Sequence, residues 1–433
     1  MAFPFNIFGK LLKRSGIEAG GGGHRWEGAS LLSSPQQQTL AARGASKARA
    51  SALYTNTAQG NRIVEAWAAA LVGKGWQARP QHPDPVARRE LAEAFEELVR
   101  PILLPLARAL VRDGEAFVQA FVGADGAFRT KLLAADQIDP SLTRDLGNGA
   151  RIIAGIEFDA ADRVTAYHVL RDAPGTPFVT YGEAVRVPAS DVLHVFDTLF
   201  PGQVRGLSWL APVLLKLRDR DEASDAMLMQ LKIASLITGF IRDPEGGSAG
   251  FEAEGGAMNV ALEPGAMRIL PPGADVTFSN PGQGLAQAIE FLRAQDREIA
   301  AGAGLTFEAL TGDLGEANYS SARVGLLEFR RRAEMLQRNL IEGMLLRPLW
   351  QRWTDVRALA GEIPAGEIEA FRAVRFVAPG WAWVDPKNEV EAEVAAINAG
   401  LKSREEVVAG RGRDIDELDE ERARDRAATG DAA

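Results

Sequence analysis

Two short stretches carry residue types that could do chemistry. The stretch "GGSAG", Gly246 to Gly250, fits the G-x-S-x-G pattern in which a hydrolase presents a serine nucleophile. That motif needs a buried strand before the serine and a helix after it, whereas both flanks here are acidic and rich in glycine. A serine hydrolase that uses Ser248 therefore stays an alternative, and a loop without catalytic function is the favoured interpretation.

The histidines and the other glycine patterns add little to an enzymatic hypothesis. His168 in "AYHVL" and His194 in "VLHVF" lie in β-type runs, where a hydrogen-bonded structural role is the common one. The stretch "GKGWQA" imitates a dinucleotide pattern but follows a helix, so Gly73 is interpreted as the cap that ends that helix. The sequence has no cysteine, no H-E-x-x-H and no G-x-x-x-x-G-K-[ST]. It predicts no catalytic residue, no metal site and no cofactor.

Length and charge limit the class of protein. A chain of 433 residues with 46% hydrophobic residues is long enough for two or three packed units. Its 49 basic and 58 acidic residues give a net charge of -9, opposite to the basic surface with which proteins grip nucleic acid tightly. Charges interrupt the apolar runs well before the ~20 residues that a membrane span needs, so we predict no membrane partner.

The first half of the chain predicts an α+β unit. Residues 1–46 are rich in Gly, Ser and Gln and predict a flexible arm. After the arm come two helical regions, of which the second is expected to break near Pro101 and Pro105 and to end at Gly114. Short β-type runs separated by turn residues then continue to about residue 203, as in antiparallel hairpins.

The second half predicts long helices around a small β insertion. One long helix is expected from 206 to 235, with Ser208 as its N-cap candidate, and another from 284 to 302. Residues 239–283, which lie between these helices, return to short β runs with Gly and Pro.

A third helix carries a basic stripe beside an apolar one. It is expected to run from 321 to 347 and to be stopped by Pro348, and short charged helices then lead to a disordered tail, 421–433. The basic stripe consists of Arg323, Arg330, Arg331 and Arg338. The simpler interpretation of this stripe is a solvated face or a partner for carboxylates of a neighbouring chain. Contact with a passing polyanion is the alternative.

The stretch "GLTFEALTGDLGEANYSSAR" lies between the second and third long helices. It offers no base, nucleophile or ligand set for a lid to cover. Gly304, Gly312 and Gly315 give it backbone freedom. We interpret it as a flexible collar element and not as an active-site lid.

The order of these elements and the motifs within them resemble those of a known protein family. The stretches "RGLSWLAPVLLKLRD", "EPGAMRILPPGADV", "GLTFEALTGD" with "NYSSAR", and "WAWVDP" resemble the lambda-type portal proteins of tailed bacteriophages, and "RDGEAFV" and "RVPASDVLHVF" extend the resemblance upstream. It covers roughly residues 47 to 415. Ala161 departs from the expected Gly-Arg turn, and the "GGSAG" region is an insertion of variable length.

The resemblance implies an α+β portal-type subunit. Its regions would be a wing, 47–203; a first stem helix, 204–238; a clip, 239–283; a second stem helix, 284–302; a tunnel loop, 303–320; a long helix and wing return, 321–380; and a helical crown, 381–420.

The resemblance also implies where DNA and partner proteins would be met. The tunnel-loop residues facing a DNA channel would be Gly304, Leu305, Thr306, Phe307, Gly312, Asp313, Gly315, Asn318, Tyr319 and Ser320. The clip residues that dock terminase and then the head–tail adaptor would be Arg242, Glu263, Pro264, Arg268 and Pro271.

By the same resemblance the chain would form a ring, usually dodecameric, at one capsid vertex of a virion, assembled in the host cytoplasm. Its partners would be duplex DNA, contacted without sequence specificity, the terminase large subunit, the head–tail adaptor, and capsid and scaffold proteins. A ring uses two different complementary faces on each subunit, so the basic stripe is expected to meet Glu290 or Asp296 of a neighbour. A scaffolding ring without a DNA channel is a further alternative.

Overall fold

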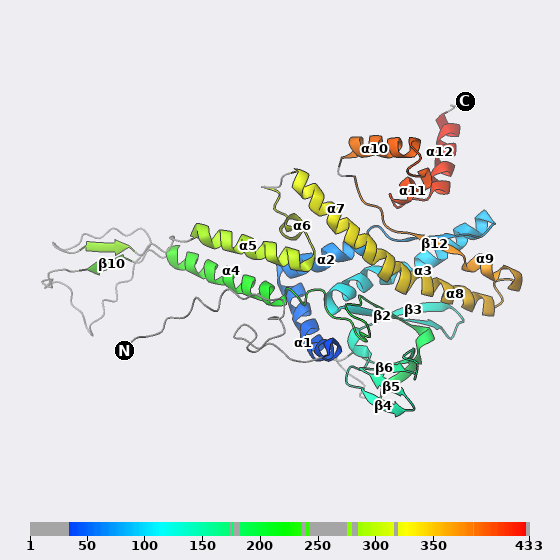
Figure 1. The fold of residues 1–433 in the computed structure, drawn as a ribbon, viewed down its shortest axis with the longest axis horizontal. Coiled ribbons are helices and arrows are strands. Elements are labelled where there is room, and N and C mark those ends of the chain that lie inside the picture. The colour runs from blue at the N-terminus through cyan, green and yellow to red at the C-terminus, as the bar shows by residue number, and fades with distance from the viewer. Residues whose placement is uncertain are drawn as a thin grey trace, which may run out of the picture.

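The computed structural model describes residues 34–173, 175, 182–235, 239–242, 275–278, 285–315, 319–383 and 385–429. Figure 1 shows an α+β body from which one pair of helices, α4 and α5, projects on one side, while α10, α11 and α12 gather on another. The fold class is α+β, as predicted from the sequence.

The body is built on three N-terminal helices. They are α1 (Pro35–Asn56), α2 (Ala58–Val72) and α3 (Pro85–Asp113). Helix α2 buries Ile63, Trp67 and Leu71, which recur at about one turn and so share one face of the helix. As predicted, this helix ends at Gly73, whose N–H donates to the carbonyl of Ala69 and whose φ is positive.

Helix α3 is continuous through both of its prolines, so the predicted break was wrong. Pro101 and Pro105 both lie on the exposed face. The carbonyls that lose an N–H partner there can bond water, while the opposite face buries Leu103 and Leu106 in the core. The helix ends at Gly114, as predicted, and a Cβ at Gly114 would lie 2.1 Å from the carbonyl carbon of Leu207.

Two antiparallel sheets follow, as the hairpin pattern predicted. The first has the order β3-β2-β9, with β2 (Glu115–Val122), β3 (Phe128–Leu133) and β9 (Val192–Phe196). The second is a five-stranded meander of β4 (Arg144–Gly147), β5 (Ala150–Ile153), β6 (Ile156–Phe158), β7 (Val164–Val169) and β8 (Val185–Pro188). Three 3-10 turns, Ala135–Gln137, Ala189–Asp191 and Ala365–Glu367, connect elements of the body.

Glu157 links three strands of the meander. Its carboxylate accepts from both Arg186 nitrogens Nε and Nη2 at 2.9 and 2.7 Å, from Thr165 Oγ1 at 2.9 Å, and lies 3.1 Å from His168 Nε2. The hydrogen bonds from Arg186, with smaller help from Thr165 and His168, lower the pKa of Glu157 to about 2. His168 is thus hydrogen-bonded inside a strand, as predicted.

This depressed pKa makes the meander sensitive to acid. A carboxyl group whose pKa is lowered in the folded state contributes stability above its unfolded pKa, and that contribution is lost as pH falls towards the folded pKa. Between about pH 5 and pH 2, we expect the urea concentration at the midpoint of unfolding to fall less steeply in Glu157→Gln than in the unaltered chain. Urea titrations at several pH values measure this midpoint. The matched control is Glu93→Gln on the exposed face of α3; an equal flattening in both variants would contradict the assignment.

The two helices predicted as a stem come next in the chain, and the word stem is kept here for the pair α4 and α5. Helix α4 covers Leu214–Ser235 and α5 covers Leu285–Ala303, and strands β10 (Gly239–Arg242) and β11 (Asp275–Phe278) pair antiparallel between them. The long helix expected from 206 begins later, because Ser208 caps a turn and not the helix: its Oγ accepts from the N–H of Leu210.

The third long helix, which begins with α7, runs past the proline that was expected to stop it. Helix α7 (Tyr319–Leu336) continues as a π-helical segment (Gln337–Leu346) into α8 (Arg347–Leu359). Pro348 is the second residue of α8 and directly follows the π-helical segment, so the helix passes through it. The wide turn before it is marked by the N–H of Arg347, which donates to the carbonyl of Glu342 five residues back.

The chain then returns to the body. Helix α9 (Ile368–Arg372) and strand β12 (Val374–Val377) lead back, and β12 pairs antiparallel with β1 (Gln77–Pro80). The last helices are α10 (Pro386–Asn398), α11 (Arg404–Ala409) and α12 (Ile415–Thr429). No helix among the described residues is long and apolar enough to cross a membrane.

Both predicted disordered ends were too long. Helix α1 begins at Pro35, inside the arm predicted for 1–46, because Arg43 is drawn into the body by a buried carboxylate. Helix α12 extends to Thr429, inside the tail predicted for 421–433, where ion pairs such as Arg413–Glu421 order a very polar sequence.

Candidate functional site

At the base of the stem, α4 and α5 form an antiparallel pair that is held together by side-chain contacts. Leu217 of α4 and Ile299 of α5 are buried against the body, and a Cβ at Gly302 would lie 2.5 Å from Val213, so the two segments approach closely. Ion pairs cross between the helices: Lys216 Nζ lies 2.8 Å from Glu298, and Arg220 Nε lies 3.0 Å from Asp296. These contacts hold the two helices side by side where they leave the body (Figure 1).

The far half of the stem leaves large apolar side chains uncovered. Among the described side chains, α4 has no buried residue after Leu217 and α5 has none before Asp296. Exposed fractions of 41–58% are found for Leu228, Met229, Leu231, Ile289 and Phe291. An isolated subunit would hold these groups in water at a cost of about 25 cal/mol per Å². Such a surface indicates contact with another chain.

The predicted clip is described only in its β hairpin. Arg242 is the last residue of β10 and stands opposite Asp275 of β11. The remaining predicted clip residues, Glu263, Pro264, Arg268 and Pro271, lie outside the described residues, as does Ser248 of the hydrolase alternative.

Within the segment predicted as a flexible loop from 303 to 320, residues 303–310 are mostly packed, which corrects that part of the prediction, whereas most of 311–315 is exposed, Leu314 by 71%. A short helix, α6 (Phe307–Thr311), lies within it. Leu305 and Leu310 are 7% and 4% exposed. Gly304 and Gly312 have positive φ, but they end α5 and α6; they do not loosen the chain.

The polar residues of this segment are also bonded. Thr306 caps α6 by accepting from the N–H of Ala309, and Phe307 lies under the guanidinium of Arg297 at 5.4 Å. Asp313 accepts from the N–H of Gly315 and from Arg293, both at 2.9 Å, and these bonds lower its pKa. Asn318 lies outside the described residues, and the side chains of Tyr319 and Ser320 are not described.

The basic stripe, which begins in α7 and ends with Arg338 in the π-helical segment, divides into two pairs. At 3.6 residues per turn, Arg330 lies about 20° from Arg323, whereas Arg331 lies about 80° away. Arg323 is 4.0 Å from Glu389, and Arg330 donates to the carbonyl of Ala382 and lies over Trp381. Arg331 and Arg338 make no ion pair or hydrogen bond within the described residues, so they remain available to a partner.

Asp296 is not available as the neighbour's partner for this stripe, which corrects the second half of that prediction. It is 6% exposed and already pairs with Arg220 of its own chain. Glu290 is exposed near the start of α5 and keeps that role as a proposal.

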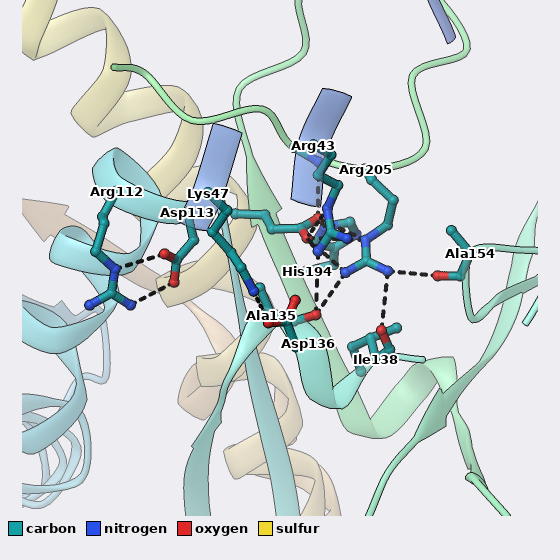
Figure 2. Close-up of polar contacts among 12 residues, drawn as sticks. Arg43, Lys47, Arg112, Asp113, Ala135, Asp136, Ile138, Ala154, His194 and Arg205 are labelled. Atoms are coloured by element: carbon teal, nitrogen blue, oxygen red, sulfur yellow. Dashed lines mark hydrogen bonds and ion pairs between the residues drawn. The ribbon is translucent and has the colours of Figure 1, made fainter. Parts of the chain in front are cut away.

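Sequence reasoning missed a buried charge cluster where the stem meets the body. Glu115, the first residue of β2, is fully buried and accepts from Arg43 of α1 and from Arg205, at distances of 2.5 and 2.7 Å. The N–H of Gly206 and the Nε2 atom of His194 complete its shell at 2.9 and 3.1 Å. Figure 2 shows Arg43 and Arg205 converging beside His194.

Arg205 ties the segment before the stem to two turns of the body at once. It is fully buried, and it donates to the carbonyls of Ala154 at 2.6 Å, Ala135 at 2.8 Å and Ile138 at 3.3 Å (Figure 2). The only signal in the sequence is a lone acid after Gly114 and a lone arginine before Gly206. Nothing local links two residues that are 90 positions apart.

Burial and charge act in opposite directions in this cluster. Burial by itself would raise the pKa of Glu115, but Arg205, the bond to His194 and Arg43 hold it well below its usual value. Burial lowers the pKa of His194, so this ring is interpreted as neutral, and burial also lowers the pKa of Arg43. Two guanidinium groups around one carboxylate leave the cluster with an excess positive charge, which backbone carbonyls solvate.

An α+β body, a projecting antiparallel helix pair and a β hairpin between those helices define the class of protein as a portal-type subunit. The chain belongs to the lambda family of phage portal proteins, because that family's sequence profile matches residues 23–337. The resemblance drawn from the sequence is thereby confirmed.

Three similar proteins illustrate the relationship. The chain is 29% identical to a protein named "Probable portal protein" from Halomonas phage phiHAP-1, over 71% of this chain and 62% of that one. It is 23% identical to portal protein B of Escherichia phage lambda, over 71% and 64%. A chain in the neck of an empty gene transfer agent particle, computed with C6 symmetry, has a TM-score of 0.51 at 18% identity, covering 84% of this chain and 93% of that chain.

The chain spans a little under two thirds of the length of these curated relatives. The family is structural and not enzymatic, and no comparison supports the serine hydrolase alternative.

Proposed function

We propose that this chain is the repeating subunit of a ring at the unique vertex of a virion capsid, through which duplex DNA enters and later leaves. The observation that carries the proposal is the uncovered apolar far half of the stem in a member of the portal family. Adjacent copies would cover Met229 and Phe291, and a ring gives every copy the same two contacts.

The charge of the chain supports passage of DNA without retention. Each phosphate that a protein neutralises adds a salt-dependent increment of affinity, and such increments repeated around a ring would stall a moving duplex. A net charge of -9 avoids this, and the arginines of α7 that face the C-terminal helices are bound within the chain. We propose that α6 and the turn after it, near Asp313, form the collar around the channel.

The proposed partners follow from this arrangement. The β10–β11 hairpin would dock the terminase large subunit during packaging and the head–tail adaptor afterwards. Capsid and scaffold proteins would surround the body, and assembly would take place in the host cytoplasm. A dodecamer is the proposed ring size.

Native mass spectrometry of the purified full-length chain, with projection images down the symmetry axis, tests the proposal. We expect a ring of about twelve copies with a bore near 20 Å, enough for a duplex whose major groove alone is about 12 Å wide. A ring without an open bore would favour the scaffolding alternative. A monomer that stays monomeric with scaffold protein present would contradict the proposal.

The second face of the ring contact is tested at α7. Arg331→Glu is expected to weaken assembly, because like charges placed opposite each other cost several kcal/mol, and Glu290 is its proposed partner. Arg144→Glu, an equal charge change on the exposed strand β4, is the control and is expected to assemble normally. Unchanged oligomer mass in the Arg331 variant would contradict this contact.

A further inference from the structure

Five ion pairs between described residues join the C-terminal helices to the body, and these five have the same polarity. On the body side, Arg79 of β1 lies 3.3 Å from Asp414 and 2.9 Å from Glu417. Three further pairs follow the same rule: Arg375–Glu405 at 3.0 Å, Arg89–Glu420 at 3.8 Å and Arg323–Glu389 at 4.0 Å. In each of these five pairs the arginine belongs to the body, and the carboxylate belongs to α10, α11 or α12 or the turn before α12.

Apolar burial contributes little to this attachment. No described residue from 381 to 429 is buried, and Val374 is the last buried hydrophobic residue of the described chain. Exposed ion pairs each contribute only about 0–1 kcal/mol and are screened by salt. Salt-sensitive ion pairs therefore contribute to holding the C-terminal helices over the body, beside a close backbone contact between Gly412 and Gly380 (Figure 1).

The body side of this contact is an unusual concentration of positive charge. In the β1–β12 ladder Arg79 stands directly opposite Arg375. Like charges at directly opposite positions destabilise a strand pair unless an anion lies between or beside them. Glu417 and Glu405 supply those anions from α12 and α11. On the body itself Glu96 also lies near Arg79 and offsets part of the charge.

The acidic side has a matching regularity. Asp414, Glu417 and Glu420 recur every three residues at the start of α12, so they share one face of the helix and lie about 4.5 Å apart along its axis. A row of evenly spaced negative charges that meets arginines is also what the phosphates of a nucleic acid strand present.

We propose that Arg79, Arg89 and Arg375 form a phosphate-binding surface for duplex DNA, the arginine surface, and that the acidic face of α12 with Glu405 of α11 covers it within the same chain. The cover keeps the arginines from retaining DNA, and its displacement exposes a binding surface. This inference deepens the proposed conduit function and rests on it for its purpose.

The test compares two triple variants of the full-length chain that change the net charge equally. In the first, Asp414→Asn, Glu417→Gln and Glu420→Gln remove the cover's charges; asparagine at 414 keeps an acceptor for the N–H groups of residues 416 and 417, as in the unaltered chain. The control is Glu391→Gln, Glu406→Gln and Asp416→Asn, exposed residues of the same helices whose side chains make no bond to the body.

Binding of a fluorescently labelled duplex of mixed sequence is measured by anisotropy over a salt series. Relative to the control, the first variant is expected to bind about tenfold or more tightly at low salt, with a log K against log salt slope steeper by about 2, one unit for each of the two freed arginines, Arg79 and Arg89. Adding Arg79→Gln and Arg89→Gln, the two arginines that this variant frees, should abolish the gain.

Equal affinities of the two triple variants would overturn the proposal, as would a gain that survives loss of the arginines. Circular dichroism checks folding, and the single changes Glu417→Gln and Asp416→Asn repeat the comparison with less perturbation. Because binding is measured on the purified chain in any oligomeric state, the arginine surface can fail while rings form, or be confirmed while they do not.

Discussion

Glu115→Gln is expected to lower the free energy of unfolding by about 3–5 kcal/mol, the range seen when one partner of a buried ion pair is removed. The amide keeps the shape of the side chain but removes its charge. The guanidinium groups of Arg205, fully buried, and Arg43, 5% exposed, are then left without a counter-charge. Urea unfolding followed by circular dichroism measures the loss.

A second glutamate provides the control for this prediction. Glu65 also accepts two hydrogen bonds from one arginine, Arg108, both at 2.9 Å, but the two side chains are 32% and 39% exposed. Glu65→Gln is therefore expected to cost less than about 1 kcal/mol. Equal losses in the two variants would contradict the view that burial makes the cluster costly to break.

Two further results would identify charge as the cause. Adding Arg43→Met to Glu115→Gln should recover part of the stability, because it removes one of the two uncompensated charges. In the unaltered chain, the contribution of Glu115 should be present above about pH 4.5, its ordinary pKa, and lost as pH falls, because the folded pKa is lowered. A double variant less stable than the single one would argue against an electrostatic origin.

Met229→Asp and Phe291→Asp are each expected to prevent ring assembly without unfolding the subunit. The two side chains are 58% and 54% exposed in the isolated chain, so a carboxylate there is solvated and tolerated. In a ring, each copy would lose about 2 kcal/mol of apolar burial per contact, roughly thirtyfold in the association constant, and would also have to desolvate a charge. Native mass spectrometry should show monomers with an unchanged circular dichroism spectrum.

Leu359→Asp serves as the matched control for the stem. Leu359 is 88% exposed at the end of α8, away from the stem, and the substitution changes polarity and charge in the same way. Rings are expected from this variant. If the stem variants assembled as well as the control does, the far half of the stem would not be a subunit contact.

Several parts of the fold could be predicted because their causes are local. Gly73 and Gly114 end helices through their own backbone conformation, and period-two runs from 115 to 196 form antiparallel strands. The stem pair and its β hairpin also follow from local pattern. The starting point of the first stem helix was placed too early, because Ser208 bonds Leu210 within a turn.

Two of the errors share a physical reason: a distant contact outweighed a local preference. Pro101 and Pro105 should break a helix, but the helix around them is held by a buried face and the prolines lie on the other. The polar segment around Arg43 should be flexible, but Glu115, 72 residues away, holds it. The packed segment around Leu305 and Leu310 was mistaken for a loop because its glycines cap helices.

The amino-acid sequence by itself determined the order of the elements, the α+β class and the family, because these depend on local periodicity and on motifs in a given order. Only the tertiary structure decided which charged side chains are paired within the chain. It assigned Asp296 to Arg220, Arg330 to Ala382, and Arg79 to the acids of α12. Ion pairs between distant residues leave no periodic pattern in the sequence. An arginine on an exposed helix face has the same local sequence pattern whether or not the fold brings a carboxylate near it.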